Sequence, residues 1–219
     1  TGMDVLTHAT EAYTSNFAND YTDGIALQTI KLVFQYLEKS VLTGDPEARE
    51  KILLSSTMAG MAFANAFLGM SHSMAHKIGG RFHTVHGRTN AILLPYVIRY
   101  NGTRPSKTTT WPKYNYWKAD EKFQDIARML GLPHSTPEEA VAAYAKAVYE
   151  LGEKVGIKMN FKDQGIDEQE WKKYTHELAL LAYEDQCSPA NPRLPMVADM
   201  EEIMNDAYYG YKERPGRIK

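Results

Sequence analysis

Hydrophobic residues recur at helical spacing along most of this chain. The clearest case is the segment 22–41, where an apolar stripe comprises Ile25, Leu27, Ile30, Leu32, Val33, Tyr36 and Leu37. Similar patterns predict helices at about 4–15, 46–66, 86–100, 119–130, 136–155, 167–185 and 197–209. No two segments show the alternation expected of paired strands. The pattern therefore predicts an all-α, bundle-like domain.

Capping and breaking residues suggest where these helices begin and end. Asp45 followed by Pro46 is typical of an N-cap and a first helical position, and Thr136 is a second candidate N-cap. We expect breaks at Gly69 and again at Gly79-Gly80. The turn-rich segment 101–118 is predicted to be a loop, and the basic tail 212–219 is expected to be loose.

Composition excludes some classes of partner. The chain has 219 residues, 43% hydrophobic and 24% charged, with a formal net charge of −2. Such a balance offers no electrostatic attraction to nucleic acid or to an anionic membrane, so we expect neither as a partner. The single cysteine, Cys187, can form no intrachain disulfide and is expected to be a buried thiol. These features are consistent with a cytoplasmic location.

Histidine is concentrated in one short segment. Four of the seven histidines, His72, His76, His83 and His86, lie within fifteen residues. Far upstream, Asp4 and His8 are four residues apart and would share one face of a helix. A carboxylate with several imidazoles suits a divalent metal such as Fe, Zn, Co or Mn. We therefore predict a metal site.

Spacing alone leaves the ligand set open. The expected break at Gly79-Gly80 would place His72 and His76 on one helical segment and His83 and His86 after a turn. Either pair could share a helix face, and a catalytic metal needs three or four ligands with one open position. One histidine would then remain for proton relay or substrate contact. The plainer alternative is that at most one of the four binds metal and the others are ordinary polar side chains.

One candidate ligand, Asp4, lies very close to the first residue of the sequence. Asp4 would be a ligand at the fourth residue, where chain termini usually fray. We therefore expect the chain to be a fragment of a larger protein. It contains no G-x-G-x-x-G segment and no P-loop, so a nucleotide-binding fold is not expected within it.

The two histidine-bearing segments resemble a known family. GMDVLTHATEAY and GMSHSMAHKIGGRFHTVHGRTNAILLP are similar to the signatures of the iron-containing (group III) alcohol dehydrogenases. Segments 96–132 and 185–210 resemble the C-terminal part of the bifunctional aldehyde–alcohol dehydrogenases of fermenting microbes. The resemblance extends over essentially the whole chain.

The resemblance implies roles for individual residues. It implies that Asp4, His8, His72 and His86 hold one divalent metal ion, typically Fe²⁺, although the same ligands accept Zn²⁺. His76 corresponds to a histidine near substrate and nicotinamide, and it is a candidate catalytic group for proton relay. His83 matches no ligand of the family.

The resemblance also implies an architecture and an activity. Family members join an N-terminal α/β domain, which binds NAD(P), to an all-helical metal-binding domain. Residues 1–219 would be the helical domain alone, so NAD(H) would bind only in the intact protein and the fragment would be inactive. The intact protein would reduce short aldehydes such as acetaldehyde to primary alcohols such as ethanol, and would form homo-oligomers, either dimers or filaments. The alternatives are a metal-dependent hydrolase and a non-catalytic helical oligomerisation module.

Overall fold

The computed structural model describes residues 1–105 and 117–210, and within these ranges the secondary structure is entirely helical. The α-helices are α1 (Gly2–Thr14), α2 (Asp20–Leu42), α3 (Pro46–Ala66), α4 (Met70–Phe82), α5 (His86–Gly102), α6 (Ala119–Leu130), α7 (Pro137–Lys154), α8 (Glu168–Tyr183) and α9 (Val197–Tyr209). A short 3₁₀ helix, η1 (Ser188–Ala190), precedes α9. The all-α prediction is confirmed. Most of the expected loop 101–118 and the whole of the expected tail 212–219 lie outside the described residues.

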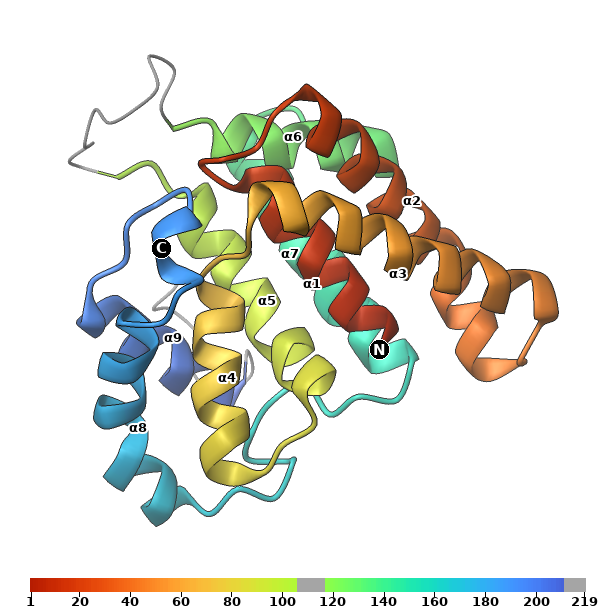
Figure 1. Ribbon diagram of the computed structural model, residues 1–219. Coiled ribbons are helices and arrows are strands. Elements are labelled where there is room, and N and C mark those ends of the chain that lie inside the picture. Colours follow the sequence, from red (N-terminus) through yellow and green to blue (C-terminus); the bar gives the residue numbers. More distant parts are fainter. Residues whose placement is uncertain (106–116, 211–219) are drawn as a thin grey trace.

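Helix α5 lies between α4 on one side and α1 on the other (Figure 1), and it contributes side chains to two hydrophobic clusters. The first cluster joins α1, α2, α3, α6 and α7, and α5 contributes Leu94 and Ile98 to it. The second joins α4, α8 and α9, with Leu93 and Val97 from the other face of α5. Because the middle of α5 is buried on both faces, residues 91–98 form a continuous apolar run, as expected of a central helix. The two clusters hold α1 and α4 against opposite sides of α5.

The predicted helix starts are confirmed where they depended on capping residues. Asp45 accepts a hydrogen bond from the backbone N–H of Ala48 at 2.9 Å, with Pro46 at the first helical position. Thr136 accepts from the backbone N–H of Glu139 at 3.2 Å. Each side-chain oxygen satisfies a backbone donor that has no partner inside its helix.

The predicted break at Gly79-Gly80 is wrong. Helix α4 continues through both glycines to Phe82 and ends at His83, which has the left-handed conformation with φ 55°. A helical glycine costs only about 1 kcal/mol relative to alanine. The buried side of α4, which includes Met74 and Ile78, packs into the second cluster and outweighs that cost. As predicted, His72 and His76 share one helix.

No single helix in the described ranges combines the length and the apolar character needed to cross a bilayer. Helices α3 and α4 satisfy the criteria only when they are taken together, and a bend of 108° separates them.

Candidate metal centre

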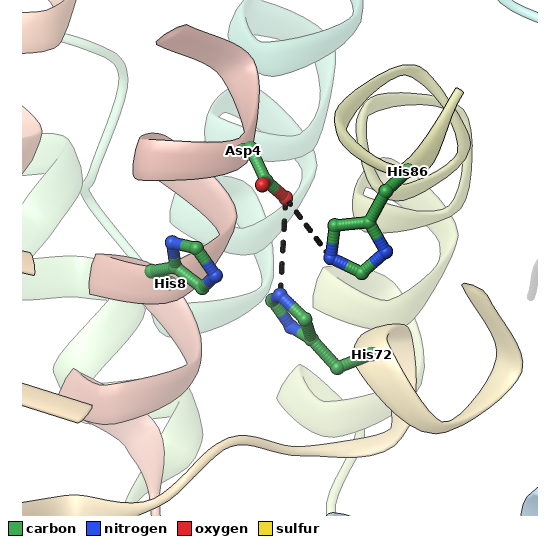
Figure 2. A group of neighbouring side chains, drawn as sticks. All are labelled: Asp4, His8, His72 and His86. Atoms are coloured by element: carbon green, nitrogen blue, oxygen red, sulfur yellow. Dashed lines mark ion pairs between the residues drawn. The ribbon is translucent and has the colours of Figure 1, made fainter. Parts of the chain in front are cut away.

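Three helices bring one carboxylate and three imidazoles together (Figure 2). Asp4 and His8 come from α1, His72 from α4 and His86 from α5, and their potential ligand atoms all lie within 4.8 Å of one another. We call these four residues the metal group. Asp4 Oδ1 lies 3.8 Å from His72 Nε2 and 3.7 Å from His86 Nε2. Residues 82 positions apart in sequence therefore meet around one small volume.

Burial differs across the metal group, and this gives the group an open side. The His72 side chain is only 1% exposed, whereas that of His86 is 45% exposed. Helix α3 closes the side next to His8, because the Phe63 ring packs against that imidazole with centroids 4.7 Å apart. A group buried at one end and open at the other has the shape of a site that binds an ion and still admits a further ligand.

Two imidazoles of the metal group, those of His8 and His86, have lowered pKa values. Burial, together with the neighbouring His72, lowers the pKa of His8 to about 4. Burial also lowers the pKa of His86. Metal binding requires a deprotonated ring nitrogen, so these environments leave lone pairs available near neutral pH.

One buried ring nitrogen in the metal group has no hydrogen-bond partner among the described residues. His72 Nε2 is buried and faces Asp4 without reaching hydrogen-bond distance. A buried polar atom without a partner is unusual in folded proteins and calls for an explanation such as an ion. The donor set, one carboxylate and three imidazoles, fits a borderline divalent metal.

Two residues beside Asp4 were not anticipated from the sequence. Asn90 donates a hydrogen bond from Nδ2 to Asp4 Oδ1 at 2.9 Å and lies 3.2 Å from His86 Nε2. A Cβ atom on Gly87 would lie 3.0 Å from the Cβ of Asp4, so this position has little room for a side chain. Their spacing from His86, one and four residues, places them on the first turns of the same helix, and this could have drawn attention to them.

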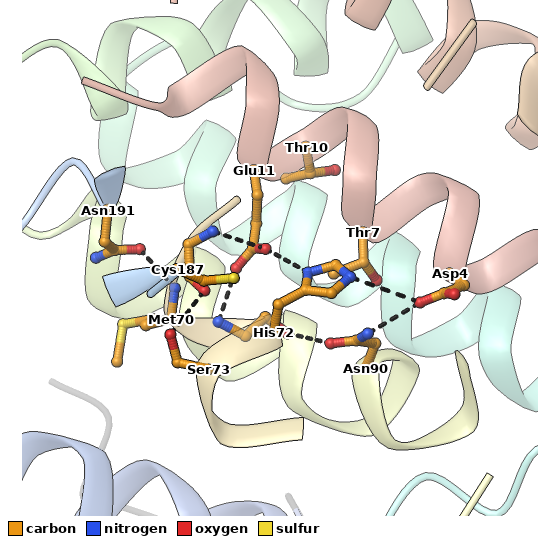
Figure 3. A network of polar contacts seen from close by, with 12 residues as sticks. Asp4, Thr7, Thr10, Glu11, Met70, His72, Ser73, Asn90, Cys187 and Asn191 are labelled. Atoms are coloured by element: carbon orange, nitrogen blue, oxygen red, sulfur yellow. Dashed lines mark hydrogen bonds and ion pairs between the residues drawn. The ribbon is translucent and has the colours of Figure 1, made fainter. Parts of the chain in front are cut away.

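Glu11 is the third residue that sequence reasoning missed. It is buried, and its Oε2 lies 2.6 Å from His72 Nδ1 (Figure 3). The sequence did contain a signal, because Asp4, His8 and Glu11 follow at intervals of four and three along one face of α1.

His76 lies beside the metal group without belonging to it. Its ring stacks against that of His86 with centroids 5.6 Å apart, and its Nδ1 lies 3.1 Å from Asp185 Oδ2. His76, Asp185 and Cys187 form a second set, whose potential ligand atoms all lie within 4.8 Å of one another. Lys77 Nζ lies 2.8 Å from Asp185 Oδ2. The positive charge of this ammonium group would repel a cation bound at the second set. His83, at the end of α4, belongs to neither set.

Cys187 is buried, as predicted. Burial and the nearby Asp185 carboxylate raise the pKa of its thiol to about 12.

Comparison with known proteins identifies the family. The model described as the C-terminal part of the Fe-containing alcohol dehydrogenase family matches residues 1–208. The chain belongs to the iron-containing alcohol dehydrogenase family. An aldehyde-alcohol dehydrogenase of Streptococcus pneumoniae serotype 2 is 78% identical over 219 residues, which are 100% of this chain and 25% of that protein. The predicted resemblance is confirmed.

Solved structures of this family share the fold. A 1,3-propanediol oxidoreductase superposes with a TM-score of 0.83 at 36% identity, over 95% of this chain and 50% of that one. A sulfoacetaldehyde reductase from Bifidobacterium kashiwanohense, solved in complex with NAD⁺, has a TM-score of 0.75 at 25% identity, over 93% of this chain and 48% of that one. This chain thus spans about a quarter of the curated relative and about half of these solved chains, and it corresponds to their helical C-terminal part.

Proposed function

We propose that Asp4, His8, His72 and His86 bind one divalent metal ion. The observation that carries this proposal is the convergence of their ligand atoms from three helices around buried His72 Nε2, which has no hydrogen-bond partner within residues 1–105 and 117–210. Fe²⁺ is the ion we propose, in keeping with the family, and Zn²⁺ is accommodated by the same donors.

We further propose that the chain is the metal-binding domain of an NAD-dependent alcohol dehydrogenase. The complete protein would carry an α/β nucleotide-binding domain before this chain, and it would reduce short aldehydes such as acetaldehyde to primary alcohols such as ethanol. Lewis-acid polarisation of the substrate oxygen is the chemistry that the ion supplies when bound. The hydride would come from NADH, so the 219-residue chain alone is expected to be inactive.

The residues of this chain would position the substrate and exchange one proton with its oxygen. His86 and Asp4 lie on the open side of the metal group, which is where a substrate oxygen can approach. His76 points Nδ1 at Asp185, so its Nε2 is the ring atom left to exchange a proton with the substrate oxygen. Phe63 covers the His8 ring and keeps water from that side.

The experiment uses the complete protein that carries this chain. Purified under conditions that retain metal, it should contain about one divalent ion per chain and should oxidise NADH when acetaldehyde is added. Chelation should abolish the activity, and Fe²⁺ or Zn²⁺ should restore it. Protein that binds no divalent ion, or that keeps its activity after the ion is removed, would contradict the proposal.

The hydrolase alternative lacks a free carboxylate base beside the metal group among the described residues. In such a hydrolase a carboxylate commonly accepts the proton of the attacking water. Asp4 is part of the metal group, and both oxygens of Glu11 accept hydrogen bonds from the start of α4. Asp185 is paired with Lys77. Reduction of aldehyde with NADH distinguishes the two activities directly.

Helix α3 exposes apolar side chains that could pack against another copy of the protein. Leu53, Leu54 and Met61 are 72%, 48% and 47% exposed. We propose that the complete protein forms homo-oligomers, as a dimer or a filament. Light scattering of the complete protein tests this, and a monomer at micromolar concentration would contradict it.

A further inference from the structure

Glu11 connects α1 to the first turn of α4. Its side chain is 2% exposed, and its carboxylate accepts two backbone hydrogen bonds, from Gly69 N at 3.0 Å and from Ser71 N at 2.7 Å. The third and shortest contact joins Oε2 to His72 Nδ1 at 2.6 Å. The N-terminus of a helix favours a negative charge, so this location suits an ionised carboxylate.

This contact determines which nitrogen of His72 carries the proton. An ionised carboxylate can only accept hydrogen bonds, so Nδ1 must be the donor. In a neutral imidazole the other nitrogen, Nε2, then has a free lone pair. That atom is the buried nitrogen for which the described part of the chain offers no hydrogen-bond partner, and it lies 3.8 Å from Asp4 Oδ1.

We propose that Glu11 is a positioning residue of the metal group: it fixes the tautomer and the ring orientation of His72 so that the Nε2 lone pair points at the ion. The inference rests on the proposed function, because it presupposes that the group binds metal. A carboxylate behind a ligand histidine both orients the ring and raises its basicity, and loss of such a partner typically weakens metal binding by about 10- to 100-fold.

Helix capping alone does not account for the arrangement. Asn191 also accepts a hydrogen bond at the start of α4, from Met70 N at 3.2 Å, but it makes no contact with His72 among the described contacts. The two residues thus serve the same helix terminus, and only Glu11 reaches the metal group. Asn191 therefore provides a matched control.

The test compares Glu11→Gln with Asn191→Ala, using Co²⁺ as a spectroscopic probe. In one orientation of the glutamine amide, the NH₂ group faces Gly69 N and His72 Nδ1 and disfavours the tautomer needed for binding. In the other orientation it faces Ser71 N, and His72 Nδ1 has only an uncharged acceptor, which raises the basicity of the ring less than a carboxylate does. Glu11→Gln should weaken Co²⁺ binding by about 10- to 100-fold. Asn191→Ala should lower the melting temperature while Co²⁺ affinity stays within about twofold of the wild type.

A measurement on the unsubstituted, metal-free chain keeps the inference testable if Glu11→Gln fails to fold. Nitrogen-15 NMR of the histidine rings should show His72 protonated at Nδ1 and unprotonated at Nε2. The opposite tautomer would overturn the inference, as would Co²⁺ binding by folded Glu11→Gln at wild-type affinity. Equal loss of affinity in Asn191→Ala would also overturn it, because helix anchoring would then suffice. Wild-type chain that binds no Co²⁺ would instead overturn the metal site itself, and this inference with it.

Discussion

His76 Nδ1 and Asp185 Oδ2 lie 3.1 Å apart, and Lys77 Nζ lies 2.8 Å from the same carboxylate oxygen. Asp185 also accepts a hydrogen bond from the backbone N–H of Cys187 at 3.0 Å. The carboxylate is thus held by three donors, and the balance of these contacts against burial lowers its pKa. A fixed acceptor behind Nδ1 leaves His76 Nε2 as the ring atom available for the proposed proton exchange.

Replacement of Asp185 by Asn should therefore impair turnover without removing the metal. In the complete protein we expect kcat for acetaldehyde reduction to fall at least about tenfold, because the neutral amide holds the His76 ring less firmly. Metal content should not change, because Asp185 lies outside the metal group. Steady-state kinetics and elemental analysis check both points.

The control for this substitution is a second histidine–carboxylate pair. His176 Nδ1 lies 2.8 Å from Glu201 Oε2 at an exposed site, and Glu201→Gln should leave kcat unchanged. Equal losses in both variants, or none in Asp185→Asn, would contradict the role given to Asp185.

Within the histidine segment, His72 and His83 should behave oppositely. His72→Ala removes a buried nitrogen of the metal group, so we expect it to abolish metal retention and activity in the complete protein. His83 lies outside the group, at the end of α4, so His83→Ala should keep its metal. Elemental analysis of the two variants checks the prediction. Unchanged metal content in His72→Ala would remove His72 from the proposed ligand set.

Gly69 has no room for a side chain. A Cβ atom there would lie 2.8 Å from Asn191 Oδ1 and 3.0 Å from Glu11 Oε1. Gly69→Ala would displace both acceptors at the start of α4, so we expect it to lower the free energy of unfolding by about 1–3 kcal/mol. Thermal or urea unfolding measures this effect, and Co²⁺ affinity should fall with it because Glu11 moves.

Gly60 is the matched control within a helix. A Cβ atom at this position in α3 would have none of the described atoms outside its own turn of helix within 4 Å. Gly60→Ala should therefore increase stability by about 0.5–1 kcal/mol, as expected for removal of a helical glycine. If Gly69→Ala proved equally harmless, the close packing inferred around Glu11 and Asn191 would be wrong.

The Cys187 thiol should react very slowly at ordinary pH. Its pKa of about 12 means that about one molecule in ten thousand is ionised at pH 8, against about a quarter of a free cysteine. Labelling by iodoacetamide should accelerate about tenfold per pH unit above 8 while the fold persists, because only the thiolate reacts. Mass spectrometry follows the labelling, with guanidinium-unfolded protein as the fast-reacting reference. Equally fast labelling of folded protein at pH 8 would contradict the raised pKa.

Local sequence was sufficient for most of the helices. Apolar periodicity predicted eight of the nine described α-helices with approximate bounds, and Asp45 and Thr136 marked two starts through capping contacts made within a few residues. Where packing opposed a local preference, prediction failed. Gly79 and Gly80 are breakers by themselves, but α4 continues through them because its buried side packs against α5, α8 and α9.

Part of the candidate site could also be predicted from local sequence, and the rest depends on packing. Asp4 and His8, four apart on one helix, could be paired from sequence, whereas spacing alone did not separate His86 from His76 or His83 as a member of the metal group. That choice depends on how α1, α4 and α5 pack, and packing is not encoded in the intervals between residues. Glu11 and Asn90 remained unseen for the same reason, because their roles consist of contacts with residues 61 and 86 positions away in sequence.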